Sequence, residues 1–371
     1  MKVTIDNRVL QSAINVVKQG ASGRSTQAIQ NDILLEAEGD SLTLTATDLE
    51  YLSVRKTIQA DVGEAGACTL DANTAADVFS TLPDGDVNIE ASEKTVSVSI
   101  GPVRFRLCSL CAADFQKLPT GDGQVVEVDA ALLSALFRKT LFNCSRDETR
   151  PALTGLLMIV TNDAIVGVST DNYRLSLLEI ALLPNSLSSD FRQEIIVSRN
   201  ALKVLQATMP DTGRIAMAFS DKIVMFSFDD VEIASRLIEG KFGAYEKVLP
   251  EGYTNAITCD TEELAQAVRR VVVIAKDDAN RVVFTVANGE VQLRSDASDH
   301  GTANDSIKCL TSGELDGFET AYNGAYLLQV LETTDGDDVT LAVESRLKPA
   351  LLTDGSALYK HVIMPMEVIV R

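Results

Sequence analysis

Across residues 128–175 the pattern of hydrophobic and polar residues is first typical of a helix and then typical of two strands. Between residues 129 and 141, apolar side chains recur every three or four positions, which places them on one face of a helix. Asp129 stands just before this stripe, where a carboxylate accepts hydrogen bonds from the first free amides of a helix. Two apolar runs, residues 156–160 and 165–169, follow with a polar turn between them. The stretch therefore predicts a helix and then a β-hairpin.

The same order of a helical stripe, two strand-like runs and a closing polar turn occurs twice more in the chain. An apolar stripe starts at Val9 in the first copy and at Leu264 in the third, and the third hairpin carries the favoured turn pair Asn288-Gly289. An aspartate closes each copy, and the three recur roughly every 125 residues, the size of one ordinary domain. These aspartates are Asp48, Asp171 and Asp296. The pattern predicts a divergent threefold repeat.

Each copy has a second half with one more amphipathic helix and several more alternating strands. We expect antiparallel sheets whose apolar faces are covered by two helices in each domain. The last helix is predicted over residues 322–331 and the last strand over residues 361–365. Proline and glycine gather at residues 118–123 and 249–252, where we expect linkers. The sequence thus predicts an α+β fold of three similar domains, at residues 1–120, 125–250 and 255–371.

Composition supports folded domains and argues against several classes of protein. Of the 371 residues, 46% are apolar and 23% are charged, which is enough apolar material for two or three cores. No apolar run is long enough to cross a bilayer, and residues 1–6 are typical of a strand rather than a signal peptide. We therefore expect a cytoplasmic protein that does not bind membranes. The six cysteines are scattered, which favours reduced thiols over a disulfide framework.

The net charge of −20 argues against a surface that simply adheres to DNA, but the charges are unevenly distributed. Acidic residues dominate loops such as 84–86 and 335–338, whereas the predicted helices carry bases on their polar faces. These bases are Arg8, Lys18, Arg138, Lys139, Arg199, Lys203, Arg269 and Arg270. If the helices share one side of the molecule, that side is far less negative than the rest. The alternative is that the helices simply expose lysine and arginine to solvent.

Residues that carry catalysis are scarce in this chain. The only histidines are His300 and His361, and no HExxH, P-loop or serine-elbow motif is present. Cys108 and Cys111 have CxxC spacing, but no second pair completes a zinc site and the pair does not open a helix. The acidic clusters lack the ordered ligand spacing of an EF-hand. We expect a non-catalytic protein without metal or cofactor, and a hydrolase that uses scattered carboxylates stays as an alternative.

Short segments spread over essentially the whole chain carry a family resemblance. They are Gly23-Arg24-Ser25-Thr26, Thr47-Asp48-Leu49-Glu50, Ala112-Ala113-Asp114-Phe115, Asp147-Glu148-Thr149-Arg150-Pro151, Thr170-Asp171-Asn172-Tyr173-Arg174-Leu175 and Val362-Ile363-Met364-Pro365-Met366. Each segment alone is a weak signal, but their order and intervals on a threefold repeat are specific. The chain resembles the bacterial DNA polymerase III beta subunit, or beta sliding clamp, family.

The resemblance implies the DNA clamp fold, in which two subunits close head to tail into a homodimeric ring of six similar domains. Helices would line the central hole, where their bases face the phosphates of an encircled duplex. A ring holds DNA by topology, so it can slide and keeps a bound polymerase at high effective concentration beside the primer end. The implied partners are double-stranded DNA, a clamp loader, the DNA polymerase III alpha subunit and other proteins with a clamp-binding motif.

The resemblance also assigns three sites. For DNA it adds the loop residues Arg24 and Arg146 to the helix bases Arg138, Lys139, Arg199, Lys203, Arg269 and Arg270. At the dimer interface it places Arg104, Phe105, Arg106 and Leu107 of domain one opposite Val273 and Ile274 of domain three. Between domains two and three it implies a pocket for short apolar peptides of the Gln-Leu-Leu-Phe type. The pocket residues are Leu153, Thr170, Asn172, Tyr173, Arg174, Leu175, Gly243, Val248, Val362, Met364, Pro365 and Met366.

Several positions depart from the family's usual pattern. Asn172-Tyr173 stands where the family usually has Gly-His, Gly243 where proline is common, and Cys111 where proline is frequent. Residues 367–371 also extend past the usual end of the chain. These departures leave open a different peptide preference. They also leave open a clamp-like scaffold or inhibitor that binds replication proteins without being loaded on DNA.

Overall fold

The computed structural model describes residues 1–22, 27–117, 123–182, 188, 190–249, 252–276, 278–297 and 301–368. Its contacts divide the chain into two compact units. The first contains Met1–Ala131 and Val197–Leu237, and the second contains Leu132–Ala181 and Ile238–Arg371. Both units consist of antiparallel sheets with helices packed against them, so the predicted α+β class is confirmed.

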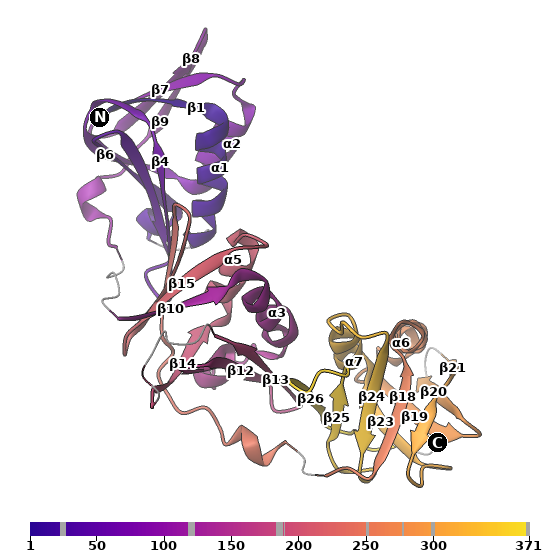
Figure 1. Ribbon diagram of the computed structural model, residues 1–371. Helices are drawn as coiled ribbons and strands as arrows, with labels where there is room; N and C mark the ends of the chain where they lie inside the picture. The colour runs from indigo at the N-terminus through magenta and orange to yellow at the C-terminus, as the bar shows by residue number, and fades with distance from the viewer. Residues whose placement is uncertain are drawn as a thin grey trace. The chain divides into compact units, whose positions relative to one another are not determined.

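The first repeat contains two helices, α1 and α2, that lie side by side (Figure 1). Helix α1 begins where Asp6 accepts hydrogen bonds from the amides of Arg8 and Val9, and α2 begins where Asp71 accepts from the amide of Thr74. The elements of the repeat are β1 (Lys2–Asp6), α1 (Asn7–Val17), η1 (Lys18–Gly20), η2 (Ala28–Asn31), β2 (Asp32–Glu38), β3 (Ser41–Thr47), β4 (Leu52–Gln59), β5 (Asp61–Glu64), β6 (Gly66–Asp71), α2 (Ala72–Thr81), β7 (Asp86–Ala91), β8 (Thr95–Ile100), β9 (Val103–Cys108) and η3 (Ala112–Asp114).

The middle repeat follows the same order. Its elements are β10 (Gln124–Asp129), α3 (Ala130–Thr140), η4 (Leu141–Asn143), α4 (Pro151–Thr154), β11 (Gly155–Thr161), β12 (Ala164–Thr170), β13 (Arg174–Ala181), β14 (Arg192–Ser198), α5 (Arg199–Thr208), β15 (Arg214–Phe219), β16 (Ile223–Phe228) and β17 (Val231–Arg236). Helix α3 starts directly after Asp129, whose carboxylate accepts the amide of Ala131 at 2.9 Å. Strands β11 and β12 pair as a hairpin, with Val160 opposite Ile165. The helix and hairpin predicted over residues 128–175 are confirmed.

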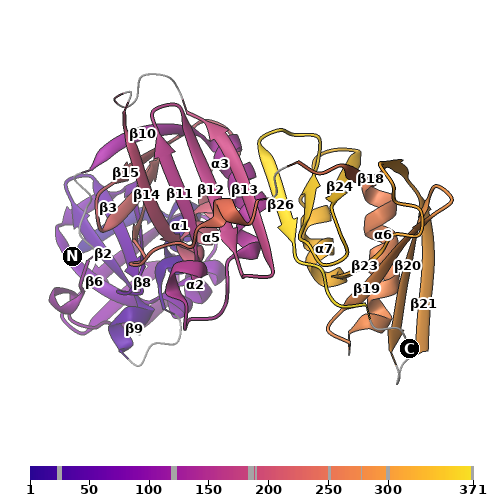
Figure 2. The ribbon, with the colours of Figure 1, turned by 90° about the horizontal axis from the view of Figure 1, so that it is seen from below.

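The third repeat has the longest helix described, α6, which packs against β20 and β21 (Figure 2). After η5 (Tyr245–Lys247) in the linker, its elements are β18 (Asn255–Asp260), α6 (Thr261–Ala275), β19 (Arg281–Ala287), β20 (Glu290–Ala297), β21 (Gly301–Lys308), β22 (Leu310–Ser312), β23 (Glu319–Asn323), α7 (Gly324–Leu331), β24 (Asp338–Val343), β25 (Ala350–Thr353) and β26 (Tyr359–Ile363). The predicted start of the last helix at residue 322 was wrong, because Asn323 caps α7 by accepting the amide of Tyr326. The last strand ends at Ile363 rather than at residue 365.

Backbone pairing continues from one repeat into the next at two places. One sheet has the order β10-β15-β16-β17-β4-β3-β2-β6, and another has the order β14-β11-β12-β13-β26-β25-β24-β18-β22. The linking pairs are β17 with β4, where Ile233 lies opposite Val54, and β13 with β26, where Ser176 lies opposite His361. Each joins the last strand of one repeat to the strand after the closing turn of the preceding repeat, and we call it a repeat joint. The middle repeat therefore contributes strands to two sheets.

The same turn stands beside both repeat joints. Thr47 donates its hydroxyl to the carbonyl of Leu52 at 2.8 Å, and Thr170 donates to the carbonyl of Arg174 at 2.7 Å. The aspartate after each threonine accepts backbone amides with Oδ1. The threonine-aspartate pair thus fixes how the chain enters the strand that forms the joint.

The end of the joining strand is held by the same turn in both cases. The amide of Arg236, at the end of β17, donates to the carbonyl of Tyr51 at 3.0 Å. The amide of Met364, just after β26, donates to the carbonyl of Tyr173 at 2.9 Å. Two divergent sequences therefore build one common connection out of backbone groups.

A buried ion pair lies beside the second repeat joint. Lys139, near the end of α3, is only 4% exposed. Its ammonium group pairs with the carboxylate of Asp354, lies 2.8 Å from Asp335, and sits 4.7 Å from the ring centroid of Tyr359. Because a charged amine removed from water needs such partners, this pair ties α3 to the third repeat.

Replacing Asp354 by asparagine should lower the free energy of unfolding by about 3–5 kcal/mol, because it removes the buried carboxylate beside the ammonium of Lys139 and leaves only the half-exposed Asp335. Asparagine keeps the Oδ1 atom that accepts the amide of Ser356, so the local turn is retained. Urea unfolding followed by circular dichroism measures the loss. The matched control is Asp335→Asn, since the side chain of Asp335 is 57% exposed and its loss should cost under about 1 kcal/mol. Equal losses in the two variants would contradict the buried-pair assignment.

Candidate functional site

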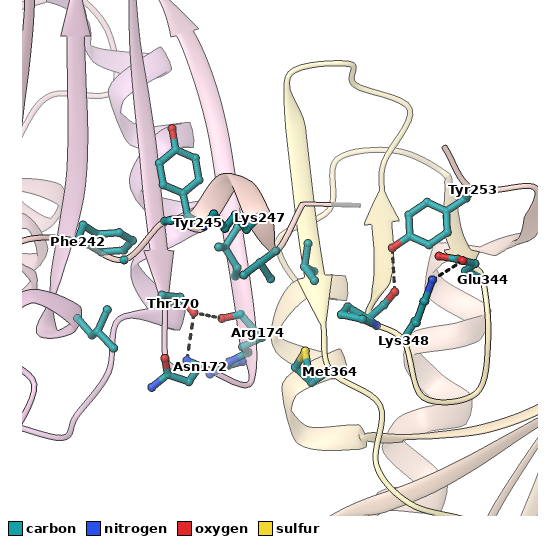
Figure 3. A pocket seen from close by; sticks show the side chains of 17 residues that line it. Thr170, Asn172, Arg174, Phe242, Tyr245, Lys247, Tyr253, Glu344, Lys348 and Met364 are labelled. Carbon is teal, nitrogen blue, oxygen red and sulfur yellow. Dashed lines mark hydrogen bonds and ion pairs between the residues drawn. The ribbon is translucent and has the colours of Figure 1, made fainter. Parts of the chain in front are cut away.

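The second unit contains a cavity of about 540 Å³ beside the β13–β26 joint. Three segments form its walls: the turn that leads into β13, the linker around η5, and the strands and loops of the third repeat. Figure 3 shows Thr170, Asn172 and Arg174 on one side and Tyr253, Glu344 and Lys348 on the other. The lining residues are Leu153, Thr170, Asn172, Arg174, Leu175, Phe242, Gly243, Ala244, Tyr245, Lys247, Val248, Tyr253, Glu344, Lys348, Pro349, Val362 and Met364.

The turn before β13 places Asn172 at the cavity in a left-handed conformation, with φ of 72°. Asparagine adopts this region more readily than most residues other than glycine. The backbone amide of Asn172 donates to Thr170 Oγ1 at 3.1 Å, and the backbone amide of Tyr173 donates to Asp171 at 3.0 Å. The departure from the usual glycine therefore keeps the turn and adds an amide side chain to the cavity wall.

Arg174 lies at the back of the cavity with only 6% of its surface exposed. Its Nε donates to Asp171 at 3.0 Å, Nη1 to Gln329 at 2.6 Å, and Nη2 to the carbonyl of Phe142 at 3.1 Å. The guanidinium also lies 4.0 Å from the ring centroid of Tyr326. Arg174 therefore holds β13 of the middle repeat to α7 of the third, and most of its donor capacity is already used.

The linker wall is anchored by apolar packing. Phe242 and Tyr245 pack against a buried cluster that includes Leu157, Leu175 and Val362. Burial, followed by the neighbouring charge of Glu246, raises the pKa of Tyr245, so its hydroxyl stays neutral at physiological pH. Phe242 and Tyr245 thus attach this wall to the buried cluster.

The wall from the third repeat is more polar. The hydroxyl of Tyr253 donates to the carbonyl of Pro349 at 2.8 Å, and burial together with Glu344 raises the pKa of Tyr253 to about 12. Lys348 forms an ion pair with Glu344 at 2.5 Å, with side chains 58% and 49% exposed. Lys247, on η5, is exposed, and its ammonium group has no hydrogen-bond or ion-pair partner in the part of the chain that the structure describes.

Nine of the twelve residues predicted for the pocket line this cavity: Leu153, Thr170, Asn172, Arg174, Leu175, Gly243, Val248, Val362 and Met364. The other three, Tyr173, Pro365 and Met366, do not line it. Tyr173 is 64% exposed next to the turn, and the amide of Met366 pairs with Ala321 at 2.7 Å.

Sequence reasoning missed eight lining residues: Phe242, Ala244, Tyr245, Lys247, Tyr253, Glu344, Lys348 and Pro349. The four in the linker lie between the predicted Gly243 and Val248 or next to them, so continuity along the chain was an available signal. The other four come from loops next to β18, β24 and β25, and no period in the sequence marks them.

The bases predicted to contact DNA differ in their surroundings. Arg24 lies outside the described residues, and Arg146 is exposed. Arg199 is half-buried and Lys203 exposed on α5. Three arginines have acidic neighbours: Arg138 with Asp335 at 2.6 Å, Arg269 with Glu332 at 3.1 Å and Arg270 with Asp305 at 2.6 Å. Lys139 is buried with Asp354, which is incompatible with a direct phosphate contact.

The residues predicted for the dimer interface occupy one edge strand and one helix. Arg104, Phe105, Arg106 and Leu107 lie on β9, at the edge of the sheet β5-β1-β7-β8-β9. Arg104 donates to the carbonyl of Gly101 at 2.6 Å. Val273 is 59% exposed and Ile274 is half-buried near the end of α6.

No group of three or more metal-ligating side chains gathers anywhere in the described parts of the chain. Cys108 and Cys111 are exposed free thiols. Among the described helices, none combines the length and the apolar character that a membrane span requires.

A buried polar cluster lies behind Arg174 at the β13–β26 joint. Ser176 Oγ lies 2.8 Å from Nδ1 of His361, and Asn143 donates to Ser176 at 2.6 Å. Phe142 stacks on the imidazole with ring centroids 5.9 Å apart. Burial, and to a lesser degree the charge of Arg174, lowers the pKa of His361 to about 3, so the ring is neutral at physiological pH.

Three family models describing the domains of the DNA polymerase III beta subunit match successive parts of the chain: the N-terminal domain at residues 1–119, the central domain at 127–244 and the C-terminal domain at 246–367. The chain is 28% identical to a beta sliding clamp of Synechocystis sp. over all of both proteins. It is 30% identical to that of Caulobacter vibrioides, covering 99% of this chain and 100% of the relative. The crystal structure of a sliding clamp from Bartonella birtlesii, bound to griselimycin, is similar with a TM-score of 0.93 and 28% identity, covering 99% of this chain and 100% of that one.

The neutral state of His361 predicts an acid-sensitive fold. The unfolded chain takes up a proton on this histidine below about pH 6.5, whereas the folded chain does so only near pH 3. The free energy of unfolding should therefore fall by about 1.4 kcal/mol for each pH unit below about 6.5 on account of this group alone. Urea unfolding at several pH values between 7 and 5 measures the slope.

The matched variant is His361→Gln, which keeps a polar group of similar reach but does not titrate. Its stability at pH 7 should be lower than that of the parent, while its decline toward pH 5 should be shallower by the amount given above. Parallel declines in the two proteins would show that His361 is protonated in the folded state.

Proposed function

The chain belongs to the DNA polymerase III beta subunit family, as its repeated segments predicted, and from this premise we propose how it works. Members of the family are sliding clamps, non-catalytic subunits that make the polymerase processive, and this is the function of the chain. We infer that two copies close into a ring of six repeats around duplex DNA. The observation that carries this inference is the repeat joint, which links neighbouring repeats twice within one chain.

The remaining joint has to form between two copies of the chain. In the described residues β9, the last strand of the first repeat, pairs only with β8, and β21, the strand after Asp296, pairs only with β20. These two strands correspond to the partners in the joints already made. Edge strands with free amides and carbonyls pair readily with another chain. We assign β9 of one copy to β21 of the other, a head-to-tail contact that closes the ring when made twice.

The predicted interface residues fit this assignment. On β9 the exposed Arg104 and Arg106 alternate with the partly covered Phe105 and Leu107. Val273 and Ile274 belong to α6, which packs against β21. Exposed apolar groups next to an unpaired edge strand are what a subunit interface requires.

The contacts to DNA in this proposal are weak and independent of sequence. The proposed contact residues are Arg24, Arg138, Arg146, Arg199, Lys203, Arg269 and Arg270, and Lys139 is left out because it is buried. An arginine that already has a carboxylate neighbour attracts a phosphate less strongly than a lone one, because the pair has little net charge. Weak contacts suit a ring that is retained by topology and has to slide.

The cavity beside the second joint is the proposed docking site for partner segments. Its apolar lining of Leu153, Leu175, Val248, Val362 and Met364 suits aliphatic or aromatic anchors, and methionine adapts its shape to different ligands. The proposed partners are the DNA polymerase III alpha subunit, the clamp loader and other proteins that carry a short apolar clamp-binding motif. Docking on a ring that encircles DNA raises the effective concentration of the polymerase at the primer end.

The proposal predicts that retention depends on DNA topology. The protein, loaded onto nicked circular plasmid by a clamp loader, should co-elute with the circle in gel filtration at salt that abolishes phosphate contacts. It should be lost once a restriction enzyme linearises the plasmid, because an open end lets the ring slide off.

The control is Val273→Ala with Ile274→Ala, which should weaken the subunit contact and prevent retention on circles. Equal retention on circular and linear DNA would contradict the ring. A parent protein that no loader places on circles, yet that still binds polymerase, would instead support the alternative of an unloaded scaffold.

A further inference from the structure

The polar groups at the back of the cavity are already engaged within the protein. Arg174 makes three hydrogen bonds, the hydroxyl of Thr170 donates to the carbonyl of Arg174, and the hydroxyl of Tyr253 donates to Pro349. A ligand would have to break an internal contact to use the engaged donors, and Arg174 keeps only the minority of its five N–H groups that these three bonds leave unused. Recognition of charge on a docked segment therefore falls to other lining residues.

Two lysines at the cavity are available to recognise charge on a docked segment. Lys247 is exposed on η5 and has no ion-pair partner within the described ranges. Lys348 is paired with Glu344, but both side chains are about half exposed, so the pair can exchange for another. Glu344 is the single carboxylate among the lining residues the structure describes, and Lys348 neutralises it. The wall consequently has an unmatched positive charge at Lys247.

We propose that Lys247 and Lys348 are specificity-determining residues that select partner segments in which acidic side chains flank the apolar anchors. The proposal rests on the docking function proposed above for the cavity. A carboxylate beside the anchors pairs with Lys247 directly, and a second one displaces Glu344 from Lys348. Each such exposed pair changes affinity by roughly two- to fivefold, so the apolar contacts provide most of the affinity and the lysines provide the selection.

The charge of the whole chain makes this selection distinguishable from a general electrostatic effect. With a net charge of −20, the long-range field of the protein attracts basic peptides and repels acidic ones. A preference for acidic flanks therefore has to arise from cations close to the bound segment.

The test uses the full-length protein and three fluorescein-labelled peptides with the same Gln-Leu-Leu-Phe core, flanked on both sides by aspartate, alanine or lysine. Fluorescence anisotropy should give the tightest binding for the aspartate peptide. Lys247→Ala should weaken that peptide about threefold and leave the alanine peptide unchanged. Lys247→Glu with Lys348→Glu should reverse the order in favour of the lysine peptide, whereas Glu344→Gln should tighten binding of the aspartate peptide by freeing Lys348.

The matched control is Lys241→Ala, which makes the same charge change as Lys247→Ala at an exposed lysine in the same linker that does not line the cavity. An equal effect of Lys241→Ala and Lys247→Ala on the aspartate peptide would overturn the proposal in favour of bulk charge. If the alanine peptide binds and the aspartate peptide binds no better, the selection by lysine is wrong while the docking function stands. If none of the three peptides binds, or if a chain that lacks residues 364–371 binds them all unchanged, the docking function itself fails.

Discussion

Backbone pairing at the repeat joint is the interaction on which the rest of this structure depends. Each joint uses amides and carbonyls of two strands and a threonine-aspartate turn, as in the pairing of β17 with β4 and of β13 with β26. Backbone groups are the same in every residue, so the joint survives while the side chains of the three repeats diverge. The docking cavity is a consequence of the second joint, since β26 brings Val362 and Met364 next to the turn at Thr170.

Buried polar groups give the second joint a single register. Across the joint, Lys139 forms an ion pair with Asp354, His361 is hydrogen-bonded to Ser176, and Arg174 donates a hydrogen bond to Gln329. A slip of one residue would leave these groups buried without partners, at a cost of several kcal/mol. His361 also makes the joint sensitive to acid, because below the ordinary pKa of histidine the unfolded chain binds a proton on this residue that the folded chain excludes.

The sequence predicted the features that depend on a local pattern of residues. It did not predict those that depend on contacts between segments far apart in the chain. The stripe after Asp129 gave α3, because periodicity and capping are local properties. Sequence predicted exposed roles for both Arg138 and Lys139, yet only Arg138 remains accessible, because Lys139 is covered where Asp354 comes in from the third repeat. Glu344, Lys348 and Pro349 reach the cavity through the pairing of β24, β25 and β26, which no single segment encodes. The family resemblance supplied pocket residues inside its matching segments and three outside them, Leu153, Gly243 and Val248, and it was silent on this wall.

The central claim is that the joint seen twice within the chain forms a third time between two copies. Hydrogen exchange of the amides in β9 and β21, measured over a range of protein concentrations, tests it most directly. The account predicts that both strands gain protection together as the sedimentation coefficient rises to that of a dimer, while the edge strand β22 continues to exchange rapidly. A dimer in which β9 and β21 exchange as fast as β22 would contradict the account.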